Sequence, residues 1–215
     1  MRASPHKLSE DTVFLNIPYD KAFRRLYLAY ITGLVHLGLD PHATVEIPSG
    51  RNRLEKILEL IRSCRYSIHD LSRVELDRTS PATPRFNMPF ELGLAVASAE
   101  IDFKSGRIGS NRRTDGRDSW FVYEARKFRL AKSLSDLGGT DPRIHGGTIE
   151  GIMRELGNTF LRRPRGDRYS VGEMMKTYRA VRLQTETIIE QTGAQSLFEA
   201  RVFRLLCTAA RAASP

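Results

Sequence analysis

TVFLNIPYD, residues 12–20, is the stretch that decides the fold. Its first half is rich in β-branched, aromatic and aliphatic residues, and Pro18 interrupts the run, so the pattern predicts a short buried strand followed by a stiff polar turn. From Lys21 apolar residues recur at every third or fourth position until Gly38, which predicts an amphipathic helix. This start of strand, turn and helix is typical of an α/β protein.

The alternation of strands and helices continues along the chain. The same patterns predict strands within 39–47, 67–70 and 120–124 and helices around 54–61, 86–99 and 148–160, with two more helices at 171–190 and 196–212. Residues 71–85, 104–118 and 138–147 have the composition of loops. We therefore expect an α/β fold of three layers with a mostly parallel sheet, in flavodoxin-like or TIR-like order, plus C-terminal helices.

The bulk composition fits a folded chain of one sizeable domain. Of its 215 residues 40% are hydrophobic and 27% are charged, which is ordinary globular usage and excludes a wholly disordered chain. We divide it into a polar leader at 1–11, an α/β domain at 12–161 and a C-terminal helical extension at 162–215. The last two helices are amphipathic enough to pair between subunits, so a homo-oligomer is expected.

The net charge of +9 lies almost wholly in residues 101–215. Such an excess is compatible with a nucleic-acid partner, but no aromatic residues alternate with the arginines as a base-stacking surface requires. A solvated or subunit-facing basic surface is the favoured interpretation. No apolar run approaches the roughly 20 residues of a membrane span, and the first residues lack the apolar centre of a secretory signal, which predicts a cytoplasmic protein without membrane contact.

Polar side chains follow the predicted strands at their carboxyl ends, where open parallel sheets bind ligands. We expect three segments to converge there as a binding site, and they contribute Asn16, Tyr19 and Asp20; Asp70 and Ser72; and Arg85 and Asn87. Asp70 is also a candidate catalytic acid. An Asx turn or a cap at the strand end explains Asp70 equally well.

Glu91 is the most informative residue because it is the only ionisable side chain between Phe86 and Ala99. A carboxylate within an apolar helix is expected to face a cavity, a partner or a ligand, since burying it unpaired costs several kcal/mol. The alternative is a structural glutamate stabilised by the helix dipole, with Asn87 as the N-cap. We favour a catalytic role for Glu91.

The sharper cofactor and metal motifs are missing from the sequence. No GxGxxG follows the first strand, and no GxxxxGK[ST] occurs anywhere. The five histidines show no HxxxH or HExxH spacing. The sequence therefore predicts no bound cofactor and no metal.

Three short segments resemble one group of flavodoxin-like domains. VFLNIPYD, SIHDLSR and FNMPFELGLAVA together resemble the TIR-like and nucleoside 2-deoxyribosyltransferase-like families. The resemblance covers roughly residues 12–125, and residues 91–95, ELGLA, match the E-L-G-x-A element of these families. The deoxyribosyltransferase pattern usually carries a second Asp and a Gly-Thr before this element, whereas residues 85–89 read RFNMP here.

The resemblance implies cleavage of an N-glycosidic bond, in TIR-like enzymes that of NAD, and a place in bacterial anti-phage defence. Cleaving a ribosyl bond builds positive charge on the sugar, which one carboxylate can stabilise. Nicotinamide leaves from a cationic ring and needs no general acid, so a single Glu91 favours NAD as the substrate over a plain nucleoside. The alternatives are a non-catalytic nucleotide-binding or oligomerisation module and a nucleoside 2-deoxyribosyltransferase-like enzyme.

Overall fold

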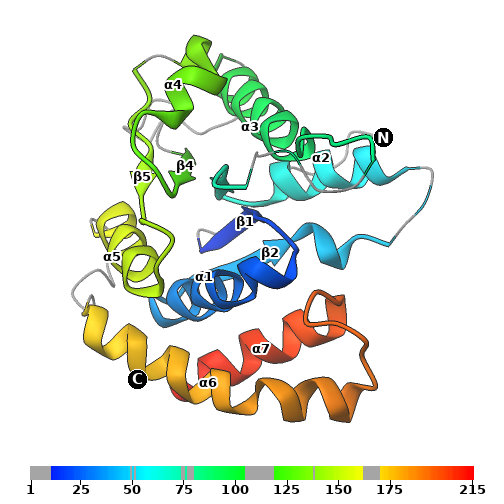
Figure 1. Ribbon diagram of the computed structural model, residues 1–215, viewed down its shortest axis with the longest axis vertical. Helices are drawn as coiled ribbons and strands as arrows, with labels where there is room; N and C mark the ends of the chain where they lie inside the picture. The colour runs from blue at the N-terminus through cyan, green and yellow to red at the C-terminus, as the bar shows by residue number, and fades with distance from the viewer. Residues whose placement is uncertain are drawn as a thin grey trace.

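The computed structural model describes residues 11–48, 50, 52–73, 76, 80–104, 119–137, 139–161 and 170–215. Most of the predicted leader, of the loop at 104–118 and of the arginine-rich break at 162–168 lies outside the described residues. Within the described part the expected α/β fold is confirmed. Five parallel strands form one sheet in the flavodoxin-like order β2-β1-β3-β4-β5, and helices cover both faces (Figure 1).

The strands alternate with helices as the sequence predicts. The sheet consists of β1 (Thr12–Asn16), β2 (Asp40–Ala43), β3 (Tyr66–Asp70), β4 (Trp120–Glu124) and β5 (Arg143–Ile144). The helices are α1 (Arg24–His36), α2 (Arg53–Ser63), α3 (Asn87–Lys104), α4 (Arg129–Ser133), α5 (Ile149–Phe160), α6 (Val171–Thr192) and α7 (Ala200–Ala213). Short 3-10 turns occupy η1 (Lys21–Phe23), η2 (Thr44–Glu46) and η4 (Ser135–Leu137).

The two faces of the sheet are covered by different helices. Alternate residues of β1 point to opposite faces, as in any strand. Phe14 packs with buried residues of α2 and α3, whereas Val13 and Leu15 belong to the larger core of α1, α5, α6 and α7. Helix α1 lies between the sheet and the C-terminal pair, with α6 and α7 on its outer side (Figure 1).

Helix α1 is buried almost all round because it is packed from both sides. Every residue from Tyr27 to His36 is buried. A Cβ on Gly33 would lie 2.7 Å from Leu156 Cδ1 of α5, so a larger residue there would require the ends of the Leu156 and Met153 side chains to shift. No helix of the described part is long and apolar enough to cross a membrane.

Two elements differ from the sequence-based expectation. The loop predicted at 138–147 contains the short edge strand β5, which pairs with β4 through Tyr123 and Glu124. Its two residues are too few to show a period, so only the partner strand reveals it. The turn after β4 also contains α4. Its five residues are too few to show a helical period in the sequence.

Candidate functional site

The carboxyl end of β1 is tied directly to the start of α3 by Asn16. The side-chain Nδ2 of this buried residue donates to the backbone oxygen of Met88 at 2.8 Å and to His69 Nδ1 at 2.9 Å. Burial lowers the pKa of His69 to about 3, so its ring is neutral and Nδ1 is free to accept. Asn16 thus fixes the position of the helix that carries Glu91.

Asp20 closes the turn after β1 and reaches the loop before α3. Its Oδ1 caps η1 by accepting from the Phe23 backbone N–H at 3.0 Å. Its Oδ2 lies 3.4 Å from the Arg85 guanidinium and 3.5 Å from that of Arg73. The turn and the loop are therefore held together by charge, as the predicted convergence of these segments requires.

Glu91 lies one turn further along α3 in a half-buried position. Its Oε2 is buried and has no hydrogen-bond partner among the described residues. Desolvation raises the pKa of Glu91 to about 7, and the nearby positive charge of Arg53 only partly opposes the shift. The helix dipole acts mainly within the first turn of a helix, and Glu91 lies beyond the first turn of α3. Stabilisation by the helix dipole therefore does not explain the position of Glu91.

Tyr19 follows β1, and its ring packs against Tyr27 and Phe198 on the α1 side of the sheet. Its hydroxyl donates weakly to the Leu15 carbonyl at 3.4 Å and accepts from Thr44 Oγ1 at 3.1 Å. Burial, with the negative charge of Glu91 as a further cause, holds the pKa of Tyr19 well above its usual range. Tyr19 thus remains a neutral phenol that can orient a polar ligand.

Asp70 takes part in a separate buried network on the opposite face of the sheet. Its Oδ2 accepts from the Tyr30 hydroxyl at 2.7 Å and lies 3.3 Å from His145 Nε2, while its Oδ1 accepts from the Ser72 backbone N–H at 2.8 Å. The last contact is an Asx turn, the alternative that the sequence left open. The fully buried carboxylate of Asp70 is directed at α1 rather than at α3.

The structure thus brings together only part of the predicted set. Asn16 bonds the Met88 carbonyl of α3, Asp20 pairs with Arg85, and Tyr19 lies close enough to Glu91 for its charge to affect the phenol. Asn87 is exposed on the first turn of α3, and Ser72 is buried beside Asp70.

Sequence reasoning missed His69, Arg53, Tyr30 and His145, which face these groups. No local spacing marks any of them. Each of the two histidines adjoins a loop or strand end, which is the one signal that singles them out.

The chemical types present are a half-buried carboxyl, a neutral phenol, an amide and two arginines. Among the residues that the structure describes, no group of three or more His, Cys, Asp or Glu side chains could hold a metal ion. What remains is a partly desolvated carboxyl that, when ionised, attracts positive charge.

Comparisons with other proteins leave the family open. No family model matches this chain, and neither a curated protein nor a solved structure matches it significantly.

The raised pKa of Glu91 predicts a pH-dependent effect on stability. A carboxyl whose folded pKa is about 7, against 4.5 for the free side chain, favours folding below pH 4.5, and this contribution is lost as the pH rises through 7. Glu91→Gln mimics the protonated form, so it should raise the free energy of unfolding by about 2 kcal/mol at roughly pH 8 and change it little at roughly pH 5.

Urea denaturation at the two pH values measures this effect. The exposed Glu100 of the same helix gives the matched control Glu100→Gln, for which no such gain at high pH is expected. An equal gain from Glu91→Gln at both pH values would contradict the assignment of a desolvated, ionisable carboxyl.

Proposed function

We propose that the protein cleaves the N-glycosidic bond between nicotinamide and ribose in NAD. The observation that carries the proposal is Glu91, a half-buried carboxyl at the carboxyl edge of a parallel sheet, whose buried Oε2 has no hydrogen-bond partner among the described residues. A cationic nicotinamide ring and the sugar cation that follows it are the charges that such a group attracts.

The chemistry needs only the chain's own side chains and water. As the bond from the anomeric carbon to the ring nitrogen breaks, its electron pair neutralises the pyridinium and nicotinamide leaves. Glu91 in its ionised form stabilises the positive charge that develops on the ribose. Water attacks the anomeric carbon and gives a proton to Glu91, whose pKa of about 7 suits a general base. The products are nicotinamide, ADP-ribose and one proton.

Neighbouring side chains have positioning roles in this scheme. Tyr19 and Asn87 are proposed to orient the ribose hydroxyls. Arg85, which is paired with Asp20, is proposed to bind a phosphate oxygen with the donors that Asp20 does not occupy. Asn16 acts through α3 by holding the Met88 carbonyl. Asp70 has no step here, because its carboxylate is engaged with Tyr30 and Ser72 on the other face.

The pH profile of the reaction tests the role of Glu91. Because the carboxylate is the active form, kcat/KM should rise from about pH 5.5 and level off above about pH 8, with a midpoint near 7. Nicotinamide release from NAD by the purified protein, followed by chromatography across this range, gives the profile. A flat profile with measurable turnover would contradict the proposed base.

Absence of nicotinamide release under all conditions would contradict the catalytic proposal as a whole. Binding of NAD without turnover would then favour a nucleotide-binding module. Release of a base from a deoxynucleoside, with NAD unreacted, would favour the transferase-like alternative. Chromatography shows which base is released, and isothermal titration calorimetry with NAD shows binding without turnover.

A further inference from the structure

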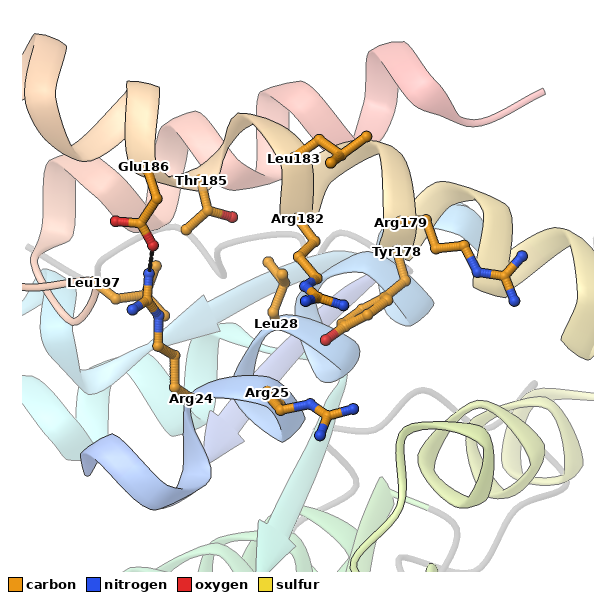
Figure 2. A pocket seen from close by; sticks show the side chains of 10 residues that line it. All are labelled: Arg24, Arg25, Leu28, Tyr178, Arg179, Arg182, Leu183, Thr185, Glu186 and Leu197. Atoms are coloured by element: carbon orange, nitrogen blue, oxygen red, sulfur yellow. Dashed lines mark hydrogen bonds and ion pairs between the residues drawn. The ribbon is translucent and has the colours of Figure 1, made fainter.

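A hollow of about 730 Å³ lies between the first turns of α1 and the middle of α6. It is lined by residues of these two helices together with Leu197, which precedes α7. Figure 2 shows Leu197 and the ion pair of Arg24 with Glu186 at one end of the hollow and Arg179 at the other. None of these residues belongs to the site around Glu91.

The rim of the hollow carries unneutralised positive charge. Four arginines line it, and among the described residues only Arg24 has a carboxylate partner. Arg25, Arg179 and Arg182 are exposed and form no ion pair or hydrogen bond within the described part of the chain. Figure 2 shows the guanidinium of Arg182 directed from α6 toward α1, where Arg25 lies. Three like charges gathered at one hollow attract an anion there.

The floor of the hollow is apolar and ends in an unused hydroxyl. Leu28, Tyr178 and Leu197 are buried there, at 4%, 2% and 4% exposure. The hydroxyl oxygen of Tyr178 has no hydrogen-bond partner among the described residues. A buried hydroxyl without a partner costs free energy unless a ligand or water satisfies it.

We propose that this hollow binds an organic phosphate of nucleotide size, as a second site distinct from that of Glu91. Guanidinium groups bind phosphate oxygens through paired hydrogen bonds, which Arg25, Arg179 and Arg182 can supply from two helices. The leucines of the lining offer an apolar surface to the base and sugar. The volume lies within the range of small-molecule pockets.

The shape of the hollow favours a small molecule over a nucleic-acid strand. A strand needs a continuous basic groove with aromatic platforms for successive bases. Here the ion pair of Arg24 and Glu186 occupies one end of the hollow. Tyr178, the one aromatic residue among the described lining residues, is only 2% exposed, so its ring cannot stack on a base. A ligand held by both helices would also fasten α6 to α1.

Isothermal titration calorimetry with ADP as the probe tests the proposal. ADP should bind the wild-type protein with a Kd below about 100 μM, and the double variant Arg179→Ala, Arg182→Ala should weaken it at least roughly tenfold. Adenosine, which lacks phosphates, should bind at least about tenfold more weakly than ADP. Both arginines are exposed, so the double variant is expected to fold, which circular dichroism checks.

Two control variants separate this site from other sources of binding. Arg201→Ala removes an exposed arginine at the start of α7, outside the lining, and should leave ADP affinity unchanged. Glu91→Gln should leave it unchanged as well, because this site is independent of the proposed function. Nicotinamide release by the double variant at saturating NAD should match that of the wild type.

Three results would overturn the proposal: no ADP binding to the wild type, equal ADP affinity in the wild type and the double variant, or tighter binding of a short single-stranded oligonucleotide than of ADP. A loss of ADP binding in Glu91→Gln, with the double variant unaffected, would place the nucleotide in the other site. These results are distinguishable from a failure of NAD cleavage, which concerns only turnover.

Discussion

Replacing Glu91 with glutamine is expected to lower the rate of nicotinamide release from NAD by about a hundredfold to ten-thousandfold. The substitution keeps the size of the side chain and removes its negative charge. The amide neither stabilises the ribosyl cation nor accepts the proton of the attacking water. The KM for NAD should change much less than kcat, because the lost interaction is strongest in the transition state.

The control for this experiment is Glu100→Gln, in which the same change is made at an exposed position of α3. It should retain wild-type kcat. Both variants are assayed at about pH 8, where the pH profile expected for Glu91 levels off. If Glu91→Gln is as active as the wild type, the role of Glu91 is refuted whatever the substrate.

Replacing Gly151 with alanine is expected to destabilise the fold by about 3 kcal/mol or more. A Cβ at this position would lie 1.9 Å from the backbone oxygen of His145 and 2.8 Å from Thr148 Oγ1. The first of these neighbours is backbone, so no side-chain rotation relieves the overlap. Thermal denaturation should show a midpoint lower by roughly 10 °C for a chain of this size.

The clash has consequences beyond α5. Thr148 caps this helix by accepting from the Gly151 backbone N–H at 3.0 Å, and His145 faces the carboxylate of Asp70. Gly93→Ala is the matched control, since its added Cβ would meet no atom within 4 Å apart from its chain neighbours and the adjacent backbone of its own helix, and it should raise stability by up to about 1 kcal/mol. A Gly151→Ala protein as stable as the wild type would contradict the close approach of α5 to His145.

Local patterns in the sequence predicted most of the elements, but not β5 or α4. The strand at 12–16 and the lone carboxyl at position 91 are both visible without a structure, because each depends on nearby residues only. The direction of Asp70 was not predictable in this way. Asn16 is level with His69 in the parallel register, so Asp70 is one residue further and points to the opposite face.

The basic hollow could not be predicted from the sequence, for a different reason. Arg179, Arg182 and Glu186 share a helical face by their spacing of three and four, but the same spacing is typical of any solvated helix surface. Only tertiary packing brings Arg24 and Arg25, some 150 residues earlier in the chain, to the same place. Likewise, β5 is recognisable only from its pairing with β4.

The burial of α1 on both sides also affects how fast its backbone amides exchange hydrogen with solvent. Amides exchange with deuterium only when local or global opening exposes them, and α1 is enclosed by the sheet on one side and by the C-terminal helices on the other. We therefore expect the peptide groups of residues 27–36 to be among the slowest to exchange in the described part of the chain. Their protection factors report the free energy of global unfolding, whereas amides near the surface report smaller openings.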